Sequence, residues 1–411
     1  MSANTDRNDE LRPGFNKTKW SVIKGKRLFN VVSLLKKEAH PNDTYYVVMP
    51  SLSPSQVLIP DTMNLTFKFK CSNTKSVFQN NLSRLLCDGL SVRVGGEVAY
   101  DNIGEGIFQR YKDLWLSDAK RENMIEYGIA NENIRKLMSK DDSATTANKE
   151  DDALMVKNQE FMKIKLGKIL TGHGPYAPYD MSDVEYRIKL PESKKVMNAQ
   201  SGESVGDYKL TDINLEFETI EGEELTQSVK DGFEVGRQLW YDYTTLLKTL
   251  EWSKSSTREV IDINIPRKSM KSIVLLCTKK NPTDSEEFLN AEVEKVKVTI
   301  EGNPNSVYSQ GLVRSEVYDE ARRFFGTTND LCNDNLSKLE FLKDKYAIVV
   351  DLRTVDDENT VHSGRKLIGT QSGVLLEIEK LATTVDLLCH VFVVSDGHIV
   401  ISNGKLQKIE Y

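Results

Sequence analysis

Apolar and polar residues alternate strictly along many short segments of this chain. A period of two with a single apolar face is typical of antiparallel sheets that pack on one side and meet water on the other. The alternating apolar positions are Met63, Leu65, Phe67 and Phe69; Val184, Tyr186, Ile188 and Leu190; Ile213, Leu215 and Phe217; and Ile261, Ile263 and Ile265. The pattern predicts an all-β protein made of many short antiparallel strands.

Four further apolar stretches add strands to this set. They are FMKIKLGKIL, KSIVLLCTKK, KYAIVVDLRT and the C-terminal LLCHVFVVSDGHIVISNGKLQKIEY. In the last stretch, Asp396-Gly397 and Asn403-Gly404 each suit a two-residue type I′ turn. We therefore expect two hairpins at the C-terminus.

Helical periodicity is confined to a few segments. Apolar residues three and four apart predict amphipathic helices near 107–118 and 313–325. Their apolar stripes are Ile107, Phe108, Tyr111, Leu114 and Trp115 in the first helix, and Val313, Val317, Tyr318, Ala321, Phe324 and Phe325 in the second. A third, weaker helix is expected in either 119–128 or 131–138. The polar, acidic stretch 139–158 predicts a long exposed loop.

The two clear helices occur in the same sequence context, half a chain apart. A strand and a Gly-Gly turn (Gly95, Gly96) precede the first helix, and a strand and a Gly-Asn-Pro-Asn turn (302–305) precede the second. Tyr111 and Tyr318 occupy equivalent positions, 318 − 111 = 207 residues apart. Coincidence is the alternative, because strand, turn and helix often follow one another. The repeat predicts a double jelly roll: two tandem eight-stranded antiparallel sandwiches with short inserted helices, each helix buried against its own sandwich.

The length of the chain, 411 residues, allows two domains with separate cores. One strand ends at Thr219 and another begins at Val260, so the boundary is expected within 220–258, where YDYTTLLKTLEW forms either a short helix or a crossing strand. We predict a basic N-terminal arm over 1–40, a first jelly roll over 41–222 and a second over 223–411.

Charge separates this arm from the rest of the chain. Residues 11–40 hold eight Lys or Arg against one Glu, which gives +7, and residues 1–10 carry −2. Since the net charge is −6, residues 41–411 carry −6 − 7 + 2 = −11. An acidic body does not favour nucleic-acid binding, whereas a basic arm attracts phosphate in a salt-sensitive way. The apolar run LFNVVSLL (28–35) argues against a wholly disordered arm.

The expected cellular setting follows from three simple observations. No apolar run approaches the roughly 18 residues of a membrane-spanning helix. The first residues are polar and lack the apolar segment of a signal peptide. Cys71, Cys87, Cys277, Cys332 and Cys389 form an odd set without a CxxC pair, so we expect reduced, mostly buried thiols in a protein made in the cytosol.

Several stretches of the chain together resemble one protein family. They are YKDLWLS (111–117), GPYAPYDMSDVEYRIKLP (174–191), NIPRKSMKSIVLL (264–276), VTIEGNPNSVYSQGL with YDEARRFFG (298–326), and VFVVSDGHIVISNGKLQKIEY (391–411). In order and spacing they are similar to the major capsid proteins of Polinton (Maverick) elements and adintoviruses, from about residue 60 to the end. No single stretch is chemically diagnostic, and the residues before about 40 and those at 141–152 match nothing in that family.

The resemblance implies a double jelly roll that forms homotrimers, the pseudo-hexagonal capsomers of an icosahedral shell around double-stranded DNA. The implied partners are other copies of the chain, a penton or minor capsid protein, and packaged DNA, which the arm would contact without sequence specificity. The implied location is the virion, after synthesis in the host cytosol, with the nucleus as a possible place of assembly. The loop at 139–158 is then expected at the outer tip of the capsomer or along the trimer seam.

The sequence contains no recognisable catalytic, cofactor-binding or metal-binding constellation. The five histidines, His40, His173, His362, His390 and His398, form neither HxH nor HExxH. His390 lies in a strand pattern and is expected to be a satisfied sheet residue. We interpret GHGPYAP (172–178) as an irregular turn, and we expect the basic turn with Arg267, Lys268 and Lys271 to be solvated. We therefore predict no catalytic, cofactor or metal residues and no cofactor.

The sequence thus favours a structural, non-enzymatic capsid subunit. The alternative is a two-domain jelly-roll protein that binds or hydrolyses carbohydrate, since acidic residues are plentiful and their separation is not fixed by the sequence. Trimers or shells formed by the chain alone would favour the first function, and monomers with glycan affinity the second.

Overall fold

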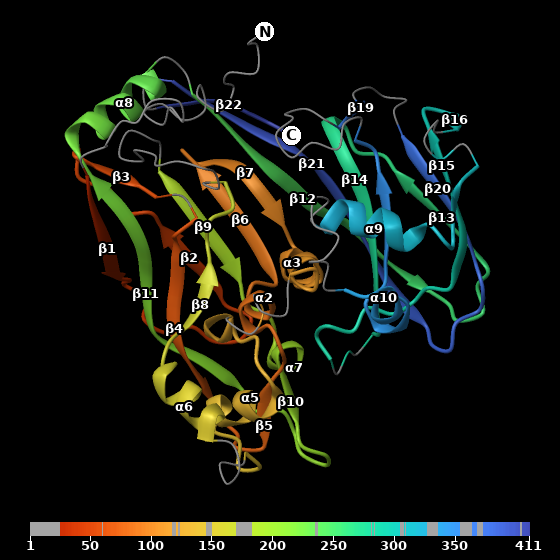
Figure 1. Cartoon of the computed structure of the whole chain (residues 1–411), viewed down its shortest axis with the longest axis horizontal. Coiled ribbons are helices and arrows are strands. Elements are labelled where there is room, and N and C mark those ends of the chain that lie inside the picture. The colour runs from red at the N-terminus through yellow and green to blue at the C-terminus, as the bar shows by residue number, and fades with distance from the viewer. Residues whose placement is uncertain are drawn as a thin grey trace.

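The structure is a computed structural model in which two β-sandwiches lie side by side (Figure 1). It describes residues 25–411 except 60, 117–120, 122–123, 145–149, 170–182, 235–236, 281, 283, 305–307, 309, 327–335, 354–363, 368–372 and 403–404. The predicted turn at 172–178, His173, His362 and Cys332 therefore lie outside the described residues. We call the two sandwiches the first and second lobes.

The first lobe consists of two four-stranded antiparallel layers. One layer has the order β1-β11-β4-β8 and the other β2-β9-β6-β7. The strands are β1 (Lys26–Ser33), β2 (Thr44–Val48), β4 (Asn64–Cys71), β6 (Gly89–Val94), β7 (Glu97–Asn102), β8 (Met162–Lys165), β9 (Val184–Lys189) and β11 (Tyr208–Glu221). The alternating residues point inward as expected: Leu65, Phe67, Tyr186 and Leu215 are all buried.

The second lobe has the same construction. Its layers have the orders β12-β21-β14-β18 and β13-β20-β15-β16. The strands are β12 (Arg237–Trp252), β13 (Arg258–Ile263), β14 (Arg267–Thr278), β15 (Val293–Ile300), β16 (Asn303–Pro304), β18 (Ala347–Asp351), β20 (Val374–Lys380) and β21 (Leu387–Ser402). The segment YDYTTLLKTLEW, for which both helix and strand were open, is part of the long strand β12.

The two lobes are connected identically. In each lobe, the first, eighth, third and sixth main strands in chain order form one layer, and the second, seventh, fourth and fifth form the other. Short strands extend this plan: β3 (Gln56–Leu58), β5 (Ser76–Phe78), β10 (Met197–Ala199), β17 (Leu312–Val313), β19 (Arg365–Leu367) and β22 (Lys405–Glu410). This shared strand order confirms the predicted duplication and the double jelly roll.

The helices connect the strands. They are α2 (Leu82–Leu86), α3 (Glu105–Asp113), η1 (Ile125–Tyr127), α5 (Glu132–Ser139), α6 (Glu150–Asn158), α7 (Ser193–Val196), α8 (Glu223–Glu234), α9 (Val317–Phe325) and α10 (Lys338–Asp344). The two predicted helices correspond to α3 and α9, each placed between the fifth and sixth main strands of its lobe. Both candidate segments for the weaker helix are helical, as η1 and α5.

The prediction of one exposed loop over 139–158 is wrong for its second half, which is α6. Asp152 in α6 accepts hydrogen bonds from the side chains of Asn131 at 3.2 Å and Asn133 at 2.9 Å. Asp152 and Asp141 are both buried. Acidic composition indicated solvent exposure, but both carboxylates are buried. Asp141 Oδ1 accepts from the Ser143 hydroxyl and the Gln200 amide, whereas Asp141 Oδ2 has no hydrogen-bond partner among the described residues.

The predicted turn at Gly95-Gly96 is present, and both glycines have positive φ. The predicted Gly-Asn-Pro-Asn turn is wrong in its extent, because the turn is Glu301-Gly302 and Asn303 and Pro304 already belong to β16. Ser402 pairs with Lys405, so β21 and β22 form the predicted hairpin, whose turn residues 403–404 lie outside the described residues.

Asp396-Gly397, by contrast, is not a turn, because β21 continues straight through it. A Cβ atom at Gly397 would meet the ring of Tyr241 on the neighbouring strand at 2.4 Å. This glycine therefore provides room for an aromatic ring.

Two buried clusters form the cores, and both long strands contribute to both of them. β12 places Tyr241 and Tyr243 in the first core and Trp252 in the second. β21 places Ile399 in the first core and Phe392 in the second. The two lobes are therefore joined by continuous sheet as well as by contact.

Helix α3 corrects a second prediction. Its apolar stripe, with Phe108, Tyr111, Leu114 and Trp115, belongs to the core of the second lobe and not to that of its own sandwich. The ring of Phe108 lies 5.3 Å from that of Phe392, and the ring of Tyr111 lies 5.0 Å from that of Phe288. The reason is position: α3 follows the edge strand β7, so its free face meets the neighbouring lobe.

The predicted N-terminal arm over 1–40 is too long. Residues 26–33 are strand β1, which pairs with β11 from Lys26↔Glu221 to Ser33↔Asn214. Ala39 bridges to Leu210. The apolar run in this segment is thus part of a sheet, and residues 1–24 lie outside the described part of the chain. The boundary at 222/223 remains a prediction about folding units.

Candidate functional site

His390 is the most buried of the histidines that the structure describes, and its environment leaves no free ring nitrogen. Nδ1 lies 3.0 Å from the Thr249 hydroxyl and Nε2 lies 3.0 Å from the Thr278 hydroxyl. Burial, together with the nearby cations Arg110 and Lys195, lowers the pKa of His390 to about 4. This confirms the expected satisfied sheet residue.

We expect this histidine to make stability depend on pH. The unfolded chain binds a proton near pH 6.5, whereas the folded protein resists it down to about 4. Stability is therefore lost as pH falls through this window, by about 2 kcal/mol between about pH 7.5 and about pH 5. Urea unfolding of wild type and His390→Gln at both pH values measures the effect, since the difference between the proteins isolates this residue. An equal loss in the variant would assign the pH dependence to other groups.

The prediction of a solvated basic turn at the start of β14 holds for Lys268, which is exposed, but not for Arg267, which is buried, or for Lys271, which is partly buried. The Lys271 ammonium lies 2.9 Å from Asp242 on β12 and 2.8 Å from Asp396 on β21, the strand between β12 and β14. Burial opposes its charge, but these carboxylates hold the pKa of Lys271 above its usual value. Lys268 pairs with Glu410 near the C-terminus.

Arg267 completes this arrangement by stacking. Its guanidinium lies 5.3 Å from the ring of Tyr243 and 5.1 Å from that of Tyr411. The two rings are themselves stacked, with centroids 4.5 Å apart. Cations over aromatic rings gain electrostatic stabilisation in such geometry. The basic turn thus anchors the C-terminus of the chain.

A cavity of about 640 Å³ lies between the lobes, lined by α2 and α3 on one side and by β12, β14 and α9 on the other. Five of the cations that line it have carboxylate partners: Arg84 with Asp113, Lys165 with Asp61, Lys168 with Glu105, Lys271 with Asp242, and Arg353 with Asp351. A lining of compensated charges is poorly suited to concentrating an anionic ligand.

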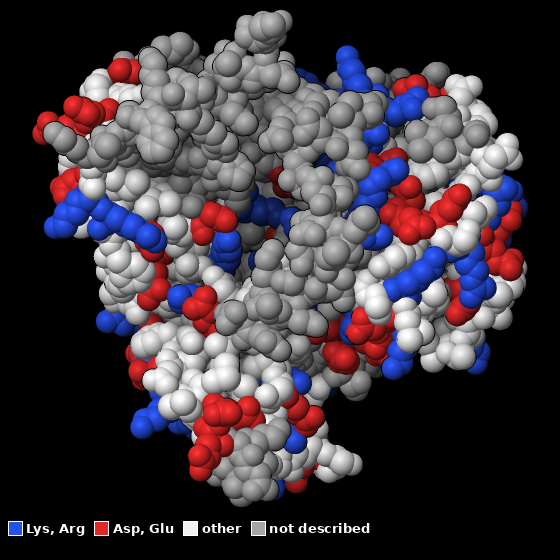
Figure 2. Space-filling view, viewed as in Figure 1, with Lys and Arg blue, Asp and Glu red and all other residues white. Residues whose placement is uncertain are grey.

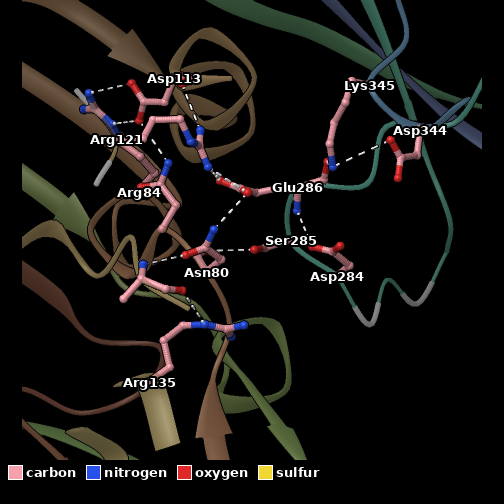
Figure 3. A network of polar contacts seen from close by, with 12 residues as sticks. Asn80, Arg84, Asp113, Arg121, Arg135, Asp284, Ser285, Glu286, Asp344 and Lys345 are labelled. Carbon is pink, nitrogen blue, oxygen red and sulfur yellow. Dashed lines mark hydrogen bonds and ion pairs between the residues drawn. The ribbon is translucent and has the colours of Figure 1, made fainter. Parts of the chain in front are cut away.

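A polar network that we call the interlobe clamp (Asn80, Arg121, Ser285 and Glu286) joins the two lobes near this cavity (Figure 3). Arg121 Nη2 donates to both Glu286 carboxylate oxygens, at 2.7 and 2.9 Å. Asn80 donates to the same carboxylate at 2.9 Å, and the Ser285 hydroxyl donates to the Asn80 carbonyl at 2.7 Å. The first lobe thus holds an acidic residue of the second by three hydrogen bonds.

Asp113, the last residue of α3, forms hydrogen bonds that hold Arg121 of the clamp in place. Arg121 Nη1 donates to the Asp113 carbonyl at 2.9 Å, and the Asp113 carboxylate accepts from Arg84 at 2.9 Å and from Asn81 at 3.0 Å. The Arg121 guanidinium is therefore held by the Asp113 carbonyl through Nη1 and by both Glu286 carboxylate oxygens through Nη2, and such charge-assisted hydrogen bonds are strong. No local sequence pattern points to this network, because Arg121 and Glu286 are 165 residues apart in a chain rich in charges.

The outer edges of the first lobe carry apolar side chains that face solvent. On β1, Phe29 is 64% exposed and Val31 is 55% exposed, and Leu35 follows just after the strand. On β2, Tyr46 and Val48 are exposed as well. Among the described strands, β1 and β2 each end their layer, so these apolar side chains lie on edge strands. Such surfaces are usually contact sites, because wet apolar strand edges promote uncontrolled association.

The rest of the visible surface has no strong charge of one sign. In the view of Figure 2, acidic and basic side chains are interspersed over both lobes. None of the described helices is long and apolar enough to span a membrane. Among the described residues, no three His, Cys, Asp or Glu side chains are grouped to hold a metal ion.

No protein-family model and no curated protein matches this sequence. Solved structures do match it over nearly its whole length. A chain in the 3.5 Å cryo-EM structure of the Sputnik virophage has a TM-score of 0.60 and 11% identity, with 99% of this chain and 92% of that chain covered. The Faustovirus major capsid protein has a TM-score of 0.61 and 6% identity, with 94% and 92% covered. The mavirus major capsid protein has a TM-score of 0.53 and 7% identity, with 92% and 89% covered.

At these identities the comparison concerns the fold. The double jelly roll with its two-lobed outline is shared with viral and virophage capsid proteins from one end of the described chain to the other. Within this fold, the interlobe clamp joins the two lobes of the chain, and the exposed apolar side chains of β1 and β2 lie on the surface of the first lobe.

Proposed function

We propose that this chain is a major capsid protein, a structural subunit without catalytic activity that builds an icosahedral shell. The observation that carries the proposal is the duplicated jelly roll, matched along almost the full length of both chains by proteins that are named as major capsid proteins. The buried ion pairs and satisfied histidine also suit a rigid building block better than a reactive site.

We further propose that the subunit is a homotrimer. Each chain contributes two lobes with the same strand order. Three chains around a threefold axis would therefore place six similar lobes in a ring. Cyclic symmetry closes the assembly and avoids open fibres. The expected interface between two chains is large, on the order of 2,000 Å² or more, as in obligate oligomers.

The finer parts of the proposal rest on the sequence resemblance. They are membership of the Polinton or adintovirus capsid group, contact with a penton or minor capsid protein, location in the virion after synthesis in the host cytosol, and contact of the basic N-terminal segment with packaged double-stranded DNA. In this proposal, the arm is limited to residues 1–24, since β1 is held in a sheet along its whole length.

Sedimentation equilibrium of the purified chain at micromolar concentration tests the assembly. The expected species is a trimer of 3 × 46.6 = 139.8 kDa, accompanied by shells or sheets in negative-stain microscopy. A single species of 46.6 kDa at every concentration and ionic strength would count against a capsid subunit and favour the monomeric carbohydrate-binding alternative.

A further inference from the structure

The contact between the two lobes of one chain follows a simple rule. β12, the first strand of the second lobe, packs beside β7, the fifth main strand of the first lobe. The rings of Tyr243 and Tyr100 lie 5.4 Å apart, and the Leu246 amide donates to the Asn102 side chain at 3.0 Å. The Tyr241 hydroxyl also donates to the Ala99 carbonyl. A first strand of one lobe therefore meets a fifth strand of its neighbour.

The same two elements remain unmatched at the outer ends of the chain. β1 is the first strand of the first lobe, and among the described strands it pairs with β11 alone. β16 is the fifth main strand of the second lobe, and together with β17 it pairs with β15. Figure 1 shows β1 at the left margin and β16 at the right margin of the molecule. The first lobe thus exposes a first strand, β1, and the second lobe exposes a fifth strand, β16, which are the two kinds of strand that meet between the lobes.

The apolar surface at these ends fits a buried contact. Phe29 and Val31 point away from the first core and are more than half exposed, and Leu35 is fully exposed. At the other end, Val313 on β17 is 36% exposed beside β15. Large apolar side chains on an open strand edge are expected to be covered in the working state of a protein.

The charges at the two ends are complementary. Residues 26–37 contain four Lys or Arg and no acid, which gives +4. Residues 292–320 contain six Asp or Glu and three Lys or Arg, which gives −3. Some of these groups have partners within the chain, such as Arg27 with Glu218 and Arg314 with Glu292. The remaining difference in sign favours approach of unlike ends over like ends.

We infer that β1 of one copy packs against the β16–β17 edge of the next copy, so that the contact between chains repeats the contact that β12 and β7 make within the chain. The partner is a second copy of this chain, bound head to tail. A head-to-tail contact uses two different surfaces and closes into a ring when its rotation is right. This inference rests on the proposed capsid function and names the strands that would form the trimer seam.

Charge substitutions on β1 provide the first test. Phe29→Glu with Val31→Glu places two charges in the inferred contact and is expected to weaken trimer association at least about tenfold in sedimentation equilibrium. The matched control is Leu339→Glu, a 77% exposed position on α10, a helix that lies away from both β1 and β16 in Figure 1. The control should assemble like wild type. Equal far-ultraviolet circular dichroism spectra for all three proteins would show that folding is intact.

Crosslinking gives the second test and identifies the partner surface. A photoreactive benzoylphenylalanine at Phe29, in a mixture of isotope-labelled and unlabelled chains, should form crosslinks between copies to residues 293–304 or 310–316. Crosslinks to β1 of another copy would indicate a twofold contact and overturn the inference. A trimer without crosslinks to those residues would overturn it as well, while leaving the capsid function standing. Wild-type protein that never forms trimers would instead overturn the proposed function.

Discussion

Replacing Tyr111 with alanine is expected to lower the free energy of unfolding by about 3–5 kcal/mol. The side chain is fully buried, and its ring lies 5.0 Å from that of Phe288 and 5.1 Å from that of Phe325. Its hydroxyl donates to the Lys345 carbonyl at 3.1 Å. Tyr111 belongs to a helix of the first lobe but fills the core of the second. The cavity left by the substitution therefore lies where the two lobes pack against each other.

Urea unfolding measured by far-ultraviolet circular dichroism and by tryptophan fluorescence tests this expectation. Tyr111→Phe is the matched control, because it removes the hydroxyl alone and should cost about 1 kcal/mol. Both probes should move together in the alanine variant, since the lobes share strands and this helix. Two separate transitions, of which one alone shifts, would contradict a shared core.

Breaking the interlobe clamp is expected to have an effect of similar size. Glu286→Ala leaves the guanidinium of Arg121 without its carboxylate, in a place where the Arg121 side chain is 15% exposed. Removing one partner of a buried ion pair typically costs about 3–5 kcal/mol, and the partial exposure of Arg121 places this case near the lower end. Thermal or urea unfolding gives the value directly.

The chain offers a surface pair as the matched control. Lys280 and Glu251 form an ion pair at 3.1 Å with side chains 74% and 72% exposed. Glu251→Ala should cost less than about 1 kcal/mol. The double variant Arg121→Met with Glu286→Leu should recover much of the loss, because apolar replacements remove the unpaired charge. A Glu286→Ala loss no larger than that of Glu251→Ala would mean that the clamp does not hold the lobes.

Local sequence patterns predicted the strands, the helices and the duplication, because the spacing of apolar residues along a short segment depends on its own secondary structure. Alternation identified inward-facing residues such as Phe67 and Tyr186 because a strand places every second side chain on the same face. Spacing of three and four identified α3 and α9. The repeated order of strand, turn and helix was enough to predict the duplication, since each lobe uses the same connections.

Contacts between distant segments could not be predicted in the same way. The stripe on α3 showed that Tyr111 is buried, but not in which lobe. Gly397 fits a turn as well as it fits a strand that faces a tyrosine ring, and only the neighbour Tyr241 decides between them. The clamp joins Asn80, Arg121 and Glu286 across long stretches of chain, and nothing in their local spacing sets them apart from other polar residues.

The position of β21 after every other main strand of both lobes has a consequence for synthesis. Ile399 and Ile401 complete the core of the first lobe, while Phe392 lies in that of the second. Until β21 leaves the ribosome, β12 lacks its partner strand, the second sandwich stays open and the core of the first lobe is incomplete. Pairing between segments so far apart in sequence makes folding slow and exposes strand edges meanwhile. Chains truncated before Leu387 therefore cannot form either finished lobe, and under the proposed function a growing shell would accept only completed copies.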